Sequence, residues 1–169
     1  MNKYVFRPYD PKFPKMFENE KEILKILVNK DAKIEHIGST AVPGLGGKGI
    51  IDIIVSVKKD YIEETKKILE NNGYIFRPEG GDDERLFFRT CYMEDKNERR
   101  IHIHLTQKNS STWKKLLKVR DYLRKHKKEA MEYSEIKRKA SESCKGKDEY
   151  VKMKEPFLKR IEKKALKEL

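Results

Sequence analysis

The segment from Lys33 to Val57, KIEHIGSTAVPGLGGKGIIDIIVSV, constrains the fold more than any other part of the chain. Its first part, Lys33–Ile37, alternates polar and apolar residues, which is typical of a half-buried β-strand. Its last part, Ile50–Val57, is β-branched and almost continuously apolar, which is typical of a buried strand. The turn between them is rich in glycine, which adopts positive φ angles and lets a backbone approach a ligand closely. The turn glycines are Gly38, Gly44, Gly46, Gly47 and Gly49.

Two features of this segment indicate a site for an anion or a metal. Gly38 and Ser39 open the turn, where backbone amides and a hydroxyl can hold a phosphate. A tight turn in which Ser39 hydrogen-bonds its own backbone is the structural alternative. Asp52 lies inside an apolar strand, where a carboxylate is costly unless it is paired, hydrogen-bonded or bound to a ligand. A structural carboxylate tied to the glycine-rich turn is equally compatible with this position. Alternation also turns either Glu35 or His36 toward the site, without deciding which.

The segment IEHIGSTAVPGL…K…IIDI resembles the GrpB-like family, a group of mostly uncharacterised bacterial proteins assigned a nucleotidyltransferase-like fold. The resemblance continues through YDPKFPKMFENE, the strand pair FFRT and RIHIHLT, and the helical motifs W…L…RDYLR, A..Y…K and Y…K..F. It spans nearly the whole chain. It implies an α/β (α+β) fold, with a nucleotidyltransferase-like mixed sheet flanked by helices and a C-terminal helical part.

The resemblance also implies roles for residues of the central segment. Nucleotidyltransferases of this fold hold the terminal phosphates of a nucleotide with a Gly-Ser pair, here Gly38 and Ser39. In active enzymes the strand acid, here Asp52, is followed two residues later by a second acid, and both bind divalent metal ions. The second position here is Ile54, so the usual carboxylate pair is broken. Asp52 is therefore the candidate catalytic residue, and whether the chain is an enzyme stays open.

His102 and His104 are the candidates to replace the missing acid. Their spacing of two residues places both imidazoles on one face of a strand, with apolar residues on the other face. Two imidazoles and a carboxylate suit a divalent metal. The resemblance places this strand near Asp52, so the expected metal ligands are Asp52, His102 and His104, with Mg²⁺ or another divalent ion as the cofactor. A polar sheet face with hydrogen-bonded histidines is the alternative.

Arg120 and Arg124 are candidates to bind an anion from a helix. The apolar stripe of the helix that begins near Thr112 reaches both arginines in heptad steps. Arginine is rarely placed on a core-facing stripe without an anionic partner. That partner is a phosphate or, alternatively, a carboxylate such as Asp121. The full set of expected phosphate-binding residues is Gly38, Ser39, Thr40, Lys48, Arg89, Arg120 and Arg124.

The rest of the chain predicts helices around one sheet. Expected helices cover about 10–29, 61–71, 112–126, 129–141 and 147–167, and Pro156 should kink the last one or start a new helix. Further strands are expected at 74–77, 85–92 and 99–106, the last two joined by a polar turn at 94–98. Asp10-Pro11 is the start signal of the first helix. The apolar face of that helix is expected to contain Met16, Phe17, Ile23, Leu24, Ile26 and Leu27.

Two Tyr-x3-Lys spacings recur in the C-terminal helices, at Tyr133 with Lys137 and at Tyr150 with Lys154. Residues four apart lie one turn apart on a helix. We expect the tyrosines to pack and the lysines to be solvated.

Length and charge indicate one domain with a basic half. The 169 residues are expected to form a single domain, with a sheet core at 1–107 and a basic helical part at 108–169. Residues 108–169 contain 21 Lys and Arg against 10 Asp and Glu, whereas residues 1–107 contain 19 against 18. This asymmetry favours an anionic partner, and a lysine-rich solvated helical surface is the alternative.

Other sequence signals exclude whole classes of protein. No apolar run is long enough to span a bilayer, and no signal-peptide pattern opens the chain. Cys91 and Cys144 have no metal-binding or redox spacing. We therefore expect a cytoplasmic protein with free thiols and no membrane partner.

Three functions remain. The first is nucleotidyl or phosphoryl transfer involving a small phosphorylated ligand. The second is a non-catalytic nucleotide- or coenzyme-binding module, suggested because some GrpB-like domains are fused to dephospho-coenzyme A kinase. The third is RNA binding by the basic helices, which is ranked last because aromatic residues for base stacking are not interleaved with the basic ones.

Overall fold

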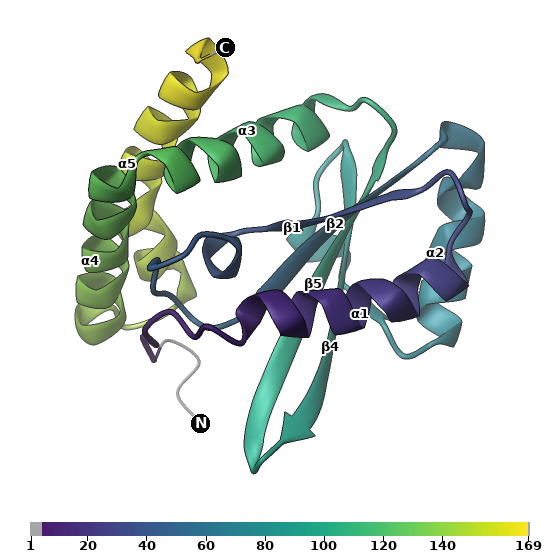
Figure 1. Ribbon diagram of the computed structural model, residues 1–169, viewed down its shortest axis with the longest axis horizontal. Coiled ribbons are helices and arrows are strands. Elements are labelled where there is room, and N and C mark those ends of the chain that lie inside the picture. The colour runs from purple at the N-terminus through teal and green to yellow at the C-terminus, as the bar shows by residue number, and fades with distance from the viewer. Residues whose placement is uncertain (1–4, 169) are drawn as a thin grey trace.

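The computed structural model describes residues 5–168. Its centre is a five-stranded sheet with the strand order β1-β2-β5-β4-β3 (Figure 1). The strands are β1 (Lys33–Ile37), β2 (Ile51–Val57), β3 (Ile75–Phe76), β4 (Arg85–Glu94) and β5 (Asn97–Gln107). The helices are α1 (Phe13–Leu27), α2 (Ile62–Asn71), α3 (Ser111–Lys125), α4 (Lys127–Ser143) and α5 (Lys147–Lys167). The prediction of a mixed sheet flanked by helices, with a helical C-terminal part, is confirmed.

The pairing of β2 with β5 is parallel, whereas the other three strand pairs are antiparallel. The register places Asp52 opposite His102 and Ile54 opposite His104. Because successive side chains of a strand point to opposite faces, Asp52 and both histidines share one face of the sheet. The apolar residues between them point to the other face.

That apolar face packs against α1 and α2 and forms the main core (Figure 1). The strands contribute β-branched, leucine and phenylalanine side chains, and the helices contribute aromatic and aliphatic ones. Central members of this core are Leu24, Ile51, Ile53, Val55, Leu69, Phe88, Ile101, Ile103 and Leu105. Burial on this scale, at roughly 25 cal/mol per Å² of apolar surface, is the main contribution to the stability of the sheet.

A second core lies among α3, α4, α5 and the glycine-rich loop. Figure 1 shows α4 and α5 at the opposite side of the molecule from α2. The members of this core are Val42, Leu45, Tyr122, Leu123, Ala130, Tyr133, Phe157, Ile161 and Ala165. Since Val42 and Leu45 belong to the loop after β1, the three C-terminal helices hold this loop in place. None of the described helices is long and apolar enough to cross a membrane.

The first helix differs from its prediction in two ways. It begins at Phe13 with Lys12 at the cap position, and Asp10 instead accepts a hydrogen bond from the Lys12 amide at 2.9 Å. Its buried face is also rotated relative to the expected one, because Ile26 is 85% exposed and Glu20 is buried. Glu20 tolerates burial because it accepts a hydrogen bond from the hydroxyl of Tyr74.

The structure also refines the predictions for two other elements. The α5 helix continues through Pro156 without a break into two helices. The β4–β5 hairpin turns at Asp95 and Lys96, whose φ angles of 50° and 65° allow a two-residue turn. The hairpin tip projects beyond the rest of the molecule (Figure 1). Before the first helix, Arg7 forms an isolated bridge with Gly47.

His36 fixes the start of the glycine-rich loop. The hydroxyl of Thr40 donates its single hydrogen to the carbonyl of Ile50 at 3.1 Å, so it accepts from His36 Nε2 at 2.8 Å. The His36 ring also stacks on Phe17, with ring centroids 4.7 Å apart. Burial is the main cause that lowers the pKa of His36 to about 4, and the nearby charges of Arg124 and Arg120 lower it further. His36 is therefore a neutral structural residue at neutral pH.

This buried histidine predicts an acid-sensitive stability. The unfolded chain binds the His36 proton near pH 6.5 and the folded chain only near pH 4, so stability falls as the pH falls through this window. We expect His36→Gln, which keeps a donor for Thr40, to remove roughly 3 kcal/mol of this pH dependence of the unfolding free energy. Urea unfolding of both proteins between pH 7 and pH 4 measures it. Parallel pH profiles for the two proteins would contradict the assignment.

Candidate functional site

A cavity of about 320 Å³ lies between the glycine-rich loop, the polar face of the sheet and helices α3, α4 and α5. One part of its wall is polar and mostly cationic, and the other part is apolar. The polar wall contains Ser39, Lys48, Asp52, His102, Arg120, Tyr133, Lys137, Tyr150 and Lys154. The apolar wall contains Val42, Leu45, Ile50, Leu116, Val119, Leu123 and Leu158. The cavity therefore suits a compact ligand with an anionic end and an apolar end.

Asp52 contributes the carboxylate of the cavity wall. Its Oδ1 lies 3.2 Å from His104 Nε2 and 3.4 Å from His102 Nδ1. Burial alone would raise the pKa of Asp52, but hydrogen bonds from His102 and His104 lower it well below its usual range. Gly38 leaves room for this carboxylate, because a Cβ there would lie 2.8 Å from Asp52 Oδ2. Asp52 is thus held ionised directly beneath the Gly38-Ser39 turn.

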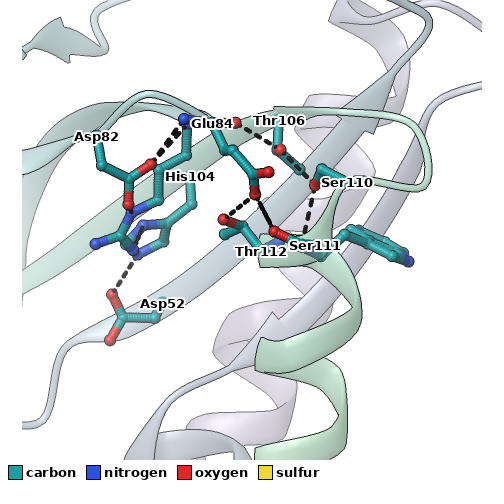
Figure 2. A network of polar contacts seen from close by, with 10 residues as sticks. Asp52, Asp82, Glu84, His104, Thr106, Ser110, Ser111 and Thr112 are labelled. Carbon is teal, nitrogen blue, oxygen red and sulfur yellow. Dashed lines mark hydrogen bonds and ion pairs between the residues drawn. The ribbon is translucent and has the colours of Figure 1, made fainter.

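The contact of His104 with Arg85 determines which ring nitrogen of His104 carries the hydrogen. Arg85 Nη1 lies 3.0 Å from His104 Nδ1, and a guanidinium can only donate. His104 Nδ1 is therefore the acceptor, and Nε2 carries the hydrogen that points to Asp52. Arg85 is itself held by Asp82, whose Oδ2 lies 3.1 Å from Arg85 Nε. Figure 2 shows Asp82 and Asp52 at the two ends of this chain of contacts, with His104 between them.

This arrangement bears on the expected metal ligands. Asp52, His102 and His104 do meet on one face of the sheet, as the register requires. Both nitrogens of His104 are engaged, however, and the buried Ile54 supplies no second carboxylate. Within residues 5–168, no group of three or more His, Cys, Asp or Glu side chains is placed to hold a metal ion. The set as arranged does not fit a divalent ion, and the expected cofactor stays a prediction.

Lys137 is the most unusual residue of the cavity, and its solvated position was predicted wrongly. It is only 4% exposed, and its Nζ lies 4.6 Å from the centre of the Tyr133 ring. No carboxylate of the described residues is within ion-pair distance of it. Burial is the main cause that lowers the pKa of Lys137 to about 7, and the charges of Lys154 and Lys48 lower it further against the opposing charge of Asp52. Burying a charge without a counter-ion is costly, so this position indicates a purpose other than stability.

Two further lysines share the cavity. Lys48 and Lys154 lie over the ring of Tyr150, at 4.6 Å and 5.3 Å from its centre. Burial, with the charge of Lys154, lowers the pKa of Lys48 to about 8, and burial also lowers the pKa of Lys154. The sequence signal for this cluster was the repeated Tyr-x3-Lys spacing on two helices. This spacing singled out Lys137 and Lys154, but it did not predict that they are buried. Helix spacing alone does not show which face of a helix lines a cavity.

The expected phosphate-binding residues divide into two groups. Those that line the cavity are Gly38, Ser39, Lys48 and Arg120, whereas Thr40, Arg89 and Arg124 lie outside its lining. Arg120 already contacts Glu35 at 2.7 Å and Asp121 at 2.9 Å. Arg124 Nε donates to the carbonyl of Ala41 at 2.8 Å. The carboxylate partner considered for Arg120 is therefore present, and both arginines tie α3 to the β1 end of the loop.

The glycine-rich loop is anchored through its own amides. Gly46 N donates to Ser134 Oγ at 3.1 Å, which joins the loop to α4. Gly47 N donates to the carbonyl of Arg7 at 3.0 Å. These two amides are thus engaged within the protein. A Cβ at Gly47 would lie 2.8 Å from Ser39 Oγ and 2.9 Å from Lys137 Nζ, so the loop backbone lies directly against both polar groups.

The start of α3 is fixed to β4 by Glu84 (Figure 2). Its Oε2 accepts from the Thr112 amide at 2.9 Å and from the hydroxyls of Ser111 and Thr112. Ser110 caps the same helix by accepting from the Trp113 amide at 3.1 Å. Since Glu84 precedes Arg85, one short segment both positions α3 and orients His104.

A pair of glycine variants tests the contact beneath the turn. Gly38 and Gly44 both have positive φ angles, 75° and 84°, but only Gly38 faces a neighbour within 4 Å. Alanine is strained at either position by the positive φ angle, and at Gly38, where ψ is −172°, the backbone lies in a region essentially restricted to glycine. We expect Gly38→Ala to lose a further 1–3 kcal/mol or so, because its Cβ displaces Asp52. Urea unfolding compares the two variants, and equal losses would contradict the contact.

Comparison with known proteins places these features in a family. A family profile described as GrpB protein matches residues 4–164. The crystal structure of the conserved protein GrpB from Enterococcus faecalis superposes with a TM-score of 0.81 and 34% identity, over 96% of this chain and 98% of that one. A weaker likeness, at TM-score 0.43 and 13% identity, links 76% of this chain with 45% of a Cid1 poly(U) polymerase bound to MgATP.

The UPF0157 protein YqkA of Bacillus subtilis is 31% identical over 165 residues, which is 92% of this chain and 47% of YqkA. The chain thus spans about half the length of that relative. The profile match and the Enterococcus faecalis structure both cover nearly the whole chain, and the chain therefore belongs to the GrpB family.

Proposed function

We propose that this protein binds a nucleotide or another small phosphorylated molecule in the cavity beneath the glycine-rich loop. The observation that carries the proposal is the burial of Lys137 beside Lys154, with no described carboxylate within ion-pair distance of either. Clustered ammonium groups in a partly enclosed site repel one another, and a phosphate would relieve that repulsion. Ser39, on the adjoining turn, would donate a hydrogen bond to the same phosphate.

The rest of the cavity supports a ligand with an apolar part. The wall opposite the lysines is formed by aliphatic side chains of the loop, α3 and α5. A volume of about 320 Å³ is at the lower end of the usual range for small-molecule sites. A nucleoside or a pantetheine-like group would occupy this wall while the phosphates face Ser39, Lys48, Lys137 and Lys154. Lysine ammonium groups would neutralise the phosphates, so binding is expected without a divalent ion.

Nucleotidyl or phosphoryl transfer is the second candidate, and one observation favours it. The carboxylate of Asp52 lines the same cavity and is held ionised. A carboxylate with so low a pKa is a weak base, and its Oδ1 is already engaged by two histidines. Binding is therefore the better supported of the two functions. RNA binding by the basic helices would instead show a steep, log–log linear loss of affinity with salt.

The binding proposal predicts opposite effects of one substitution on stability and on binding. Lys137→Met replaces a buried amine by an apolar side chain of similar length, so the ligand-free protein should gain roughly 1–3 kcal/mol. The same variant should lose most of its affinity for phosphates. Thermal unfolding measures both, with ATP, ADP and 4′-phosphopantetheine, each with and without Mg²⁺. A ligand at one hundred times its Kd adds about 2.7 kcal/mol to wild-type stability.

The matched control is Lys139→Met, because Lys139 is exposed on the same helix and the change in charge is identical. This control should match the wild type in both readouts. Stabilisation that requires Mg²⁺ and disappears in Asp52→Asn would favour transfer over simple binding. If no phosphorylated compound stabilises the wild type, the proposal is wrong.

A further inference from the structure

We propose that the cavity takes up a proton when its phosphorylated ligand binds, and that Lys137 is the group that receives it. This inference rests on the proposed function and adds to it a coupling between affinity and pH. It follows from where the charges of the cavity lie and from which of them are already engaged.

The surroundings of Lys137 contain more positive than negative charge. Each element around the cavity contributes at least one titratable or charged group. These groups are Tyr133 on α4, Tyr150 and Lys154 on α5, Lys48 on the loop, Asp52 on β2, His102 on β5 and Arg120 on α3. Among the described residues that line the cavity, Asp52 is the single carboxylate, and its Oδ1 is shared between His102 and His104.

Lys137 is the lysine least able to keep its proton in the empty cavity. It is 4% exposed, and a Cβ at Gly47 would lie 2.9 Å from its Nζ, so the loop closes over it. Desolvation disfavours an ammonium group, and the like charges of Lys48 and Lys154 act in the same direction. The pKa of Lys137, lowered to about 7, agrees with this geometry.

A bound phosphate reverses both effects. It brings negative charge into the cavity and accepts hydrogen bonds from Nζ, so it favours the protonated amine. The pKa of Lys137 then rises, and above neutral pH the complex contains one proton more than the free protein and ligand together. Affinity should consequently fall as the pH rises, by up to about tenfold per pH unit while one proton is taken up.

Isothermal titration calorimetry counts this proton directly. The probe is ATP without Mg²⁺ at pH 8, where a phosphate with a second pKa near 6 is already ionised. Titration in two buffers of different ionisation enthalpy gives the number of protons bound. We expect at least about one proton for the wild type, because Lys48, whose pKa is lowered to about 8, takes up a further fraction at this pH, and a Kd that weakens between pH 7 and pH 9.

Lys137→Arg is the decisive variant, because a guanidinium keeps its charge at any working pH. It should bind ATP with proton uptake reduced by most of one proton and with a flatter pH profile. Lys139→Arg, at an exposed position of the same helix, should behave as the wild type does.

The outcomes separate this inference from the proposed function. If ATP binds the wild type with no proton uptake, the inference is wrong and the proposed function stands. If Lys137→Arg retains the full proton count, another group takes up the proton and the assignment to Lys137 is wrong. If ATP, ADP and 4′-phosphopantetheine all fail to bind, both are overturned. The wild-type proton count requires no variant, so a folding defect in Lys137→Arg leaves that test intact.

Discussion

The parallel pairing of β2 with β5 is the constraint on which the polar site depends. It sets Asp52 beside His102, and it places His104 where it donates to the same carboxylate oxygen. Two histidines thereby use the carboxylate that would otherwise balance the lysines of α4 and α5. Among the described residues that line the cavity, basic side chains outnumber carboxylates, and the anion that we propose as the ligand would balance this charge.

The burial of Lys137 lowers the stability of the protein, although the same lysine is the residue that we propose binds the ligand. Folded domains are stable by only about 5–15 kcal/mol, so an unpaired buried lysine is a substantial cost. The second core, formed by α3 to α5 with Val42 and Leu45, offsets that cost and holds the loop over Lys137. Hydrogen bonds from α4 and α3 to the loop, at Gly46 and Ala41, make the loop part of the packed structure. The cavity is therefore preformed.

Much of this architecture could be predicted from local patterns in the sequence. Alternation in β5 correctly placed His102 and His104 on one face. The repeated Tyr-x3-Lys spacing identified Lys137 and Lys154 as residues but not as cavity residues. Their burial depends on how α4 and α5 pack against the loop, which is a long-range property that no local pattern contains. The exposure of Ile26 has the same cause, since tertiary packing selects which face of α1 is buried.

The central claim is that the buried amine of Lys137 has no carboxylate of the described residues within ion-pair distance and binds the phosphate of a ligand. Nuclear magnetic resonance of isotopically labelled lysine side chains, titrated with pH, tests it most directly. The account predicts one lysine signal that titrates near pH 7, is missing in Lys137→Met, and shifts to a higher pKa when ATP is added. If every lysine titrates near 10.5 in the free protein, or if ATP leaves the low-pKa signal unchanged, the account is contradicted.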